Sequence, residues 1–138
     1  SNKIKEYVAR VKELGMNSAA ITDHGVMYGV IDFYRAAREA GIKPILGCEV
    51  YVAPNSRFDK ELTGGEDRYH HLVLLAENNT GYANLMKIVS RGFTEGYYYK
   101  PRVDMKLLQQ FHEGSPIYFK GHERRGENGG PQIRGMLR

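Results

Sequence analysis

Hydrophobic positions in the first half of the chain alternate between helical and strand-like spacing. One helical face is formed by Ile4, Val8, Val11 and Leu14. Gly15 follows as a natural left-handed helix stop. The apolar run at residues 18–22 then predicts a strand. This order recurs further along the chain, so the sequence predicts helices and strands in alternation.

The next elements follow the same order. Residues 30–40 predict a helix that ends at Gly41, and residues 43–52 predict a buried strand. Residues 53–68 are polar and rich in glycine and proline, which indicates a surface loop. Residues 71–76 predict another strand.

Two further helices are predicted. Thr80 can cap the first, which ends near Gly92, and Asp104 can cap a shorter one through Phe111. Strands alternating with helices of this length predict an α/β fold with parallel strands and right-handed crossovers. A barrel and an open doubly wound sheet both satisfy this pattern.

The composition is that of one globular domain. The chain has 138 residues, of which 41% are hydrophobic and 26% charged. No apolar run approaches the roughly 20 residues needed to cross a bilayer, so no membrane partner is expected. The single Cys48 excludes an internal disulfide and is expected to be a small buried side chain. A reducing, cytoplasmic location fits these features.

Acidic and imidazole side chains adjoin three predicted strands. Asp23 and His24 follow the first, Glu49 lies in the second, and His71 opens the third. Ligands of α/β folds collect at the carboxyl ends of strands, a rule that His71 fits poorly. Carboxylate and imidazole suit zinc, manganese and iron, so the spacing predicts part of a metal site.

Each candidate also has a simpler interpretation. Asp23 can be a helix cap with His24 as a polar turn residue. Glu49, within an apolar run, must either face solvent on an edge strand or hold a cation, because an unpaired buried carboxylate is costly. His70 and His71 must point to opposite faces of a strand, so at most one joins a given site.

Four segments together resemble the PHP (polymerase and histidinol phosphatase) domain family. They are residues 20–29 (AITDHGVMYG), 41–54 (GIKPILGCEVYVAP), 71–76 (HLVLLA) with 79–82 (NTGY), and 92–102 (GFTEGYYYKPR). The last two are similar to the branch found at the N-terminus of the alpha subunit of bacterial replicative DNA polymerase III. The resemblance covers residues 1–114, and the four segments in combination are specific for this family.

The resemblance implies a distorted (β/α)7 barrel whose strand ends hold divalent metals. Asp23, His24, Glu49 and His71 match metal-ligand positions of that family. Such a cluster supports phosphoester hydrolysis in some members, and a proofreading-type or purely structural role in polymerases. The implied metals are zinc, manganese or iron, with magnesium for the whole polymerase. The implied partners are the other polymerase domains, replisome subunits, and DNA reached through the rest of that protein.

The sequence departs from the family pattern at both ends. The family's first His-x-His strand and a downstream Asp-x-His pair have no counterpart here, which predicts a partial barrel, incomplete at both ends. Residues 115–138 carry five Lys or Arg against two Glu, with many glycines and no regular period. They are expected to be a disordered or out-of-frame basic tail, in which His122 is a solvated residue.

The expected function is a fragment of a replicative-polymerase PHP domain with part of a metal-dependent phosphoesterase or proofreading-type site. Nothing matches the carboxylates of a polymerase palm, so no catalytic residue is assigned and the fragment alone is expected to be inactive. A stand-alone phosphoesterase and a non-catalytic partner-binding module remain alternatives. The aromatic segment Tyr97, Tyr98, Tyr99 and Lys100 suits stacking on single-stranded nucleic acid or packing against neighbouring polymerase domains.

Overall fold

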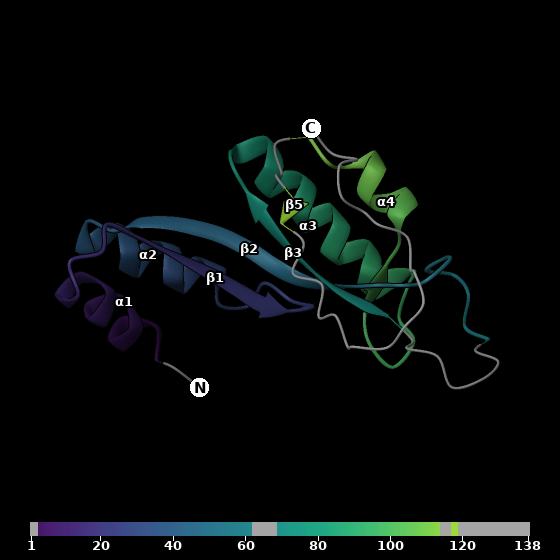
Figure 1. Cartoon of the computed structure of the whole chain (residues 1–138), viewed down its shortest axis with the longest axis horizontal. Helices are drawn as coiled ribbons and strands as arrows, with labels where there is room; N and C mark the ends of the chain where they lie inside the picture. The colour runs from purple at the N-terminus through teal and green to yellow at the C-terminus, as the bar shows by residue number, and fades with distance from the viewer. Residues whose placement is uncertain (1–2, 62–68, 114–116, 119–138) are drawn as a thin grey trace, which may run out of the picture.

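The computed structural model describes residues 3–61, 69–113 and 117–118. Its elements are α1 (Ile4–Glu13), β1 (Ser18–His24), α2 (Val30–Ala40), β2 (Lys43–Val52), β3 (His70–Ala76), α3 (Asn79–Thr94), β4 (Arg102–Val103), α4 (Met105–Gln110) and β5 (Ile117–Tyr118). The long strand β2 spans the molecule, with β1, α1 and α2 at one end and β3, α3 and α4 at the other (Figure 1). The predicted mixture of helices and strands in one α/β unit is confirmed.

The strands form one sheet in the order β1-β2-β3-β5, with β4 paired to β2. β1 runs parallel to β2 and places His24 beside Glu49. β3 runs antiparallel to β2 and places His71 opposite Tyr51. The expectation of parallel strands throughout is therefore wrong for β3. The described part of the connection, residues 53–61, contains no helix, and an antiparallel neighbour needs no crossover helix.

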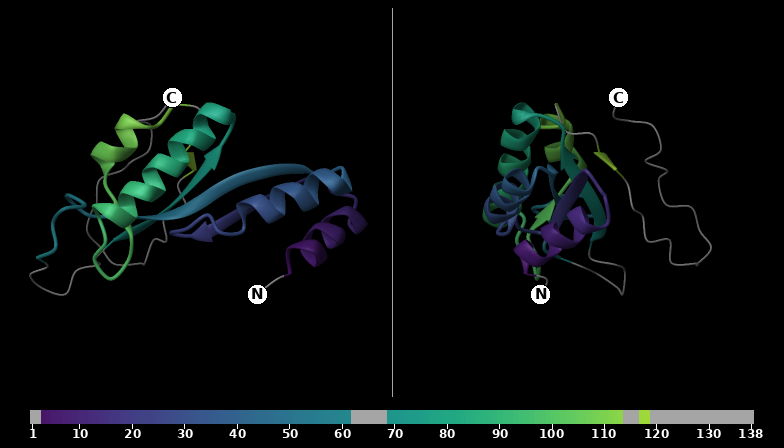
Figure 2. Two further views of the ribbon diagram at one scale, coloured as in Figure 1. Left: turned by 180° about the vertical axis from the view of Figure 1, so that it is seen from behind. Right: turned by 90° about the vertical axis from the view of Figure 1, so that its left-hand side faces the viewer.

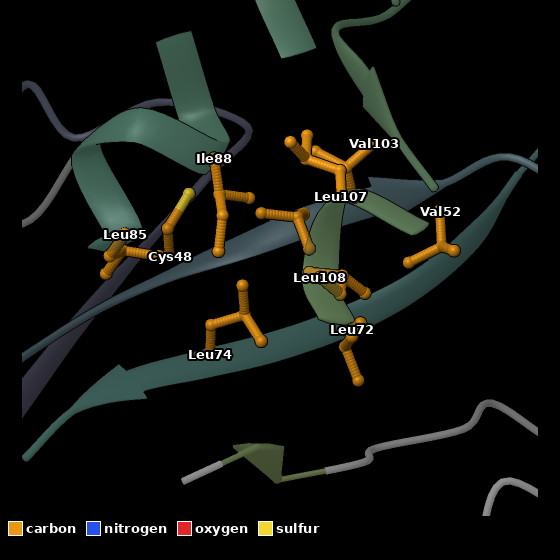
Figure 3. Close-up of a cluster of buried hydrophobic side chains, with 10 residues drawn as sticks. Cys48, Val52, Leu72, Leu74, Leu85, Ile88, Val103, Leu107 and Leu108 are labelled. Carbon is orange, nitrogen blue, oxygen red and sulfur yellow. The ribbon is translucent and has the colours of Figure 1, made fainter. Parts of the chain in front are cut away.

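The helices pack on one face of this sheet. α1 and α2 bury Val8, Val11, Phe33 and Ala37 against Ala19 of β1. α3 and α4 contribute Leu85, Ile88, Leu107 and Leu108 to a second cluster, over Cys48, Val50, Val52, Leu72 and Leu74 (Figure 3). Figure 2 shows α3 and α4 side by side next to β3. Because side chains alternate along a strand, the intervening residues of β2 and β3, Glu49 and His71 among them, face the other way.

Most predicted helix ends are confirmed, and one is wrong. Gly15 and Gly41 take left-handed φ angles of 74° and 73°. Asp104 caps α4 by accepting a hydrogen bond from the backbone N–H of Leu107 at 2.9 Å. The cap of α3 is Asn78 rather than Thr80, and α3 extends to Thr94. Asparagine is as good a cap as threonine or better, and its position two residues earlier lets it reach the third helical N–H.

The predicted tail falls almost entirely outside the described residues, His122 included. Only Ile117–Tyr118 is described, and it forms β5 antiparallel to β3. A strand pairing therefore occurs where the sequence pattern predicted none. Across the described part of the chain, no helix combines the length and apolar character that spanning a bilayer demands.

Candidate metal centre and its surroundings

Two of the four predicted ligands, His24 and His71, converge on the carboxylate of a third, Glu49. His24 Nδ1 lies 3.3 Å from Glu49 Oε2, and His71 Nδ1 contacts Glu49 Oε1 directly. The register explains this meeting, because His24 and Glu49 are partners in the parallel β1–β2 pair, and His71 is diagonal to Glu49 across β2–β3. The side chain of Glu49 is 19% exposed, whereas His24 and His71 reach the surface.

The antiparallel direction of β3 removes the objection to His71. The first residues of β3 lie beside the last residues of β2, so His71 reaches the edge where β1 and β2 end. Glu49 also has a partnership that the sequence did not suggest. It lies on a central strand and binds two imidazoles, rather than standing at a solvent-facing edge.

Asp23 does not join this group. It pairs with Cys48 across β1–β2, and alternation places its side chain on the sheet face opposite to that of His24. Its Oδ2 accepts a hydrogen bond from the backbone N–H of Gly29 at 3.0 Å, at the start of α2. Asp23 is nevertheless not the predicted helix cap, because the N-cap of α2 is Gly29 and no side chain caps that helix. The role of Asp23 as a metal ligand stays a prediction.

The donor set around Glu49 has the chemistry of a transition-metal site. One carboxylate and two imidazoles suit zinc, manganese or iron. In the described residues, however, no three His, Cys, Asp or Glu side chains are grouped so that they could hold a metal ion. The imidazole nitrogens of His24 and His71 are directed at Glu49 itself. The four-ligand assignment therefore remains a prediction.

Cys48 does not add a ligand to this centre. Its side chain is fully buried on the helix-covered face, as predicted, and Sγ donates to the carbonyl of Val26 at 3.2 Å. Burial raises the pKa of the Cys48 thiol to about 12. The group is therefore protonated at neutral pH, while metal binding needs the thiolate.

Aromatic rings border the Glu49 group on the same face. Tyr51 makes edge contacts with Tyr69 and His71, at centroid distances of 4.9 and 5.2 Å. Burial raises the pKa of Tyr51, and the negative charge of Glu49 raises it further. Gly25 fits against the Tyr51 ring, because a Cβ there would lie 2.9 Å from Tyr51 Cε2.

The aromatic segment at residues 97–100 has one half-buried member, Tyr98, and three exposed ones. Tyr98 covers the guanidinium of Arg102 at 5.2 Å, whereas Tyr97 and Tyr99 are 52% and 63% exposed. Tyr99 adopts a φ of 60°, which is unusual for a bulky residue. The predicted stacking on nucleic acid and the alternative of packing against another protein domain both stay predictions.

Two buried arginines that the sequence analysis missed fix the loops beside the centre. Arg57 donates to both carboxylate oxygens of Asp104 at 3.0 Å and pairs with Glu95 at 2.6 Å. Arg102 donates to the carbonyls of Gly96, Arg57 and Asp59. The loop after β2, expected to lie on the surface, is therefore anchored from within. The signal in the sequence that could have indicated this ion pair was Asp104. Capping α4 occupies only part of its carboxylate, so the remaining acceptor positions need another donor.

This network gives a pH-dependent contribution to stability. Burial raises the pKa of Asp104, but hydrogen bonds from the backbone N–H groups of Arg57 and Leu107 and from the Arg57 guanidinium outweigh it, so the pKa lies below its ordinary value. A depressed carboxyl pKa stabilises the fold above the ordinary pKa of about 3.9, and the contribution is lost as pH falls through the folded-state value.

We expect the urea midpoint to fall as the pH is lowered below 4, and to fall less steeply in Asp104→Asn, which has no carboxyl to protonate. Urea titrations at pH 6, 4 and 3 measure this difference. Equal pH profiles for the two proteins would remove Asp104 from the acid response.

Comparison with known proteins places the chain in a family. Residues 1–127 match the PHP domain. The chain is 50% identical over 113 residues to DNA polymerase III subunit alpha of Chlamydia pneumoniae, covering 82% of this chain and 9% of that protein. It is 50% identical over 115 residues to DNA polymerase III subunit alpha of Treponema pallidum (strain Nichols), covering 83% of this chain and 10% of that protein. The chain belongs to the PHP domain family, and the predicted resemblance is confirmed.

The chain spans about a tenth of the length of these relatives. A solved structure assigned as a metal-dependent phosphoesterase of Bifidobacterium adolescentis aligns with a TM-score of 0.42 and 18% identity, covering 68% of this chain and 30% of that one. The family membership rests on the sequence match and not on this structural similarity.

Proposed function

We propose that this chain is a PHP domain of the polymerase III alpha-subunit type, and that the group around Glu49 binds a divalent metal for phosphoester hydrolysis. The observation that supports this proposal is the convergence of His24 and His71, from two different strands, on one carboxylate. A packing role alone would not require two exposed imidazoles at the same edge of the sheet. The relatives named as polymerase subunits favour this branch over a stand-alone phosphoesterase.

The residues have distinct roles in this proposal. Glu49 supplies the anionic ligand, and His24 and His71 supply neutral nitrogen donors after turning from the carboxylate toward the cation. Asp23 is the fourth proposed ligand, and it would have to leave its hydrogen bond to Gly29. A divalent cation there supplies Lewis-acid polarisation of a phosphoryl oxygen and activation of water. Zinc, manganese and iron match the donors, and magnesium would serve the polymerase as a whole.

The proposed partners follow from the relatives. We propose that the surface of this domain meets the other domains of a polymerase alpha subunit and subunits of the replisome. DNA would then be reached through the rest of that protein, because the described residues contain no polymerase active site that we can assign.

A metal titration tests the proposed site. Glu49→Gln removes the anionic ligand with little change in shape, so we expect manganese affinity to fall about tenfold or more. Isothermal titration calorimetry with Mn²⁺ measures the change, and Glu77→Gln, an exposed carboxylate after β3, is the matched control. Asp23→Asn in the same series decides whether Asp23 is a ligand. Unchanged manganese affinity in Glu49→Gln would exclude the site.

A second candidate function is a non-catalytic structural module. The specific observation in its favour is that Glu49 already binds both imidazoles, so that the group can join β1, β2 and β3 without a metal. This role predicts that Glu49→Gln lowers thermal stability in EDTA while phosphate release is absent with manganese. In a longer protein that carries the whole PHP domain, the proposed hydrolytic role predicts manganese-dependent phosphate release that Glu49→Gln, His24→Ala and His71→Ala each abolish.

A further inference from the structure

Lys100 lies close to the Glu49 group although no metal-ligand pattern includes it. Its Nζ stands 5.7 Å from the centre of the Tyr51 ring, and the same ring contacts the imidazole of His71. Tyr51 also shares a sheet face with Glu49, two positions away on β2. The Lys100 ammonium and the His71 imidazole are therefore neighbours of the same tyrosine ring.

A strained and firmly anchored turn sets this position. The backbone N–H of Tyr98 donates to the carbonyl of Lys100 at 3.0 Å, and Tyr99 between them has a φ of 60°. Such backbone strain persists only where the surroundings impose it. They do so here through the neighbouring β4, in which buried Arg102 is paired with Tyr51. The turn thus holds Lys100 at a fixed place beside the sheet edge.

No salt bridge is found for Lys100 in the part of the chain that the structure describes. An ammonium beside a cation site opposes metal binding by repulsion, but it attracts an anion that binds between the two charges.

We propose that Lys100 is a substrate-positioning residue that binds the phosphoryl group of a phosphate ester at the Glu49 group. The inference rests on the proposed function, because that function supplies the phosphate ester. It adds a role that the metal ligands cannot fill. The ammonium on the turn holds a phosphoryl oxygen from the side of Tyr51, while the imidazoles and the carboxylate act from the strand ends.

Inorganic phosphate is the probe for a direct test on the whole chain. Its binding is followed by NMR shifts of the His71 and Tyr51 resonances in EDTA, where only the protein's own charges act. We expect Lys100→Gln to weaken phosphate binding roughly fivefold to tenfold, the size of one exposed charge-assisted hydrogen bond. Lys100→Arg keeps the charge and should restore most of the affinity.

Lys87→Gln is the matched control. Lys87 also stands over an aromatic ring, 5.5 Å from the centre of Phe111, but on α3 and away from the Glu49 group. Phosphate affinity should be unchanged in this variant. Equal losses of phosphate affinity in Lys100→Gln and Lys87→Gln would indicate a general effect of net charge. Failure of Lys100→Arg to restore binding would indicate that Lys100 acts through its packing and not through its charge. Either result, or no phosphate binding by the unaltered chain, would overturn the inference.

Manganese affinity of Lys100→Gln separates positioning from structural support. Removing a nearby positive charge should leave manganese binding unchanged or slightly tighter, whereas a loosened site would bind both ions less well. Parallel weakening of phosphate and manganese would therefore contradict the positioning role. If manganese does not bind at all while the phosphate difference persists in EDTA, the proposed metal function fails and the anion-binding role of Lys100 stands by itself.

Discussion

Asp104→Ala is expected to destabilise the fold by about 2–3 kcal/mol, because the buried Arg57 Nη1 loses its hydrogen-bond acceptor while Glu95 still pairs with the rest of the guanidinium. Arg57 and Asp104 are both buried, and three hydrogen bonds join them. The substitution also removes the cap of α4. Domains of this size are stable by only about 5–15 kcal/mol, so the loss is a large share of the total. Urea unfolding followed by circular dichroism measures it.

A double-mutant cycle separates the ion pair from the cap. Arg57→Met combined with Asp104→Ala removes both members of the pair, so no buried guanidinium donor is left unsatisfied, and Glu95, which is 31% exposed, keeps contact with solvent. We expect the double variant to lose less stability than the sum of the two single losses. Asp32→Asn, an exposed carboxylate on α2, is the control and should change stability little. Additive losses would show that Arg57 and Asp104 act independently.

The sequence predicted the elements well because their signals are local. The helical spacing and the glycine stop placed α2 at the observed bounds, and the apolar run 43–52 corresponds to β2. The direction of β3 was not predictable in the same way. Parallel and antiparallel neighbours can carry the same pattern of apolar residues, and the choice depends on how residues far apart in the chain pair.

The candidate site was predictable only where residue type and local spacing determine it. Residue type and strand ends singled out His24 and Glu49, and the family resemblance added His71. Both imidazoles contact the Glu49 carboxylate, while metal binding by the three residues stays a prediction. The orientation of Asp23 was missed because the first strand was expected to end at Thr22, whereas β1 continues through His24. Two consecutive residues inside a strand must point to opposite faces, so Asp23 and His24 separate.

The burial of Arg57 and Arg102 could not be predicted from local sequence patterns. Arg57 lies in a polar loop, and its partner Asp104 is 47 residues away. A loop rich in glycine and proline is normally solvated, so the pattern favoured an exposed arginine. Only the tertiary structure brings the two charges together. The same arrangement fixes the turn that carries Lys100, since Arg102 binds the carbonyls of Gly96 and Arg57.

Gly96→Ala is expected to disrupt this arrangement and to destabilise the fold by about 3 kcal/mol. A Cβ at this position would lie 1.8 Å from the carbonyl oxygen of Arg102 and 3.2 Å from Cβ of Arg57. The nearest atom belongs to the backbone of β4, so it cannot turn aside as a flexible side chain would. The segment from Gly96 to Arg102 must therefore shift, and Lys100 shifts with it. Thermal unfolding and the phosphate titration measure the two consequences.

Gly92→Ala is the matched control four residues earlier. Its nearest neighbours would lie at 3.4 Å or more, at ordinary contact distance, and the residue is inside α3. Alanine favours the helix over glycine by roughly 0.5–1 kcal/mol, so this variant should be as stable as the parent or slightly more stable. Opposite signs for the two substitutions would show that close backbone approach, and not the loss of glycine as such, governs Gly96. A stable Gly96→Ala with unchanged phosphate binding would mean that the Lys100 turn tolerates displacement, and the anchoring role of Arg102 would then be wrong.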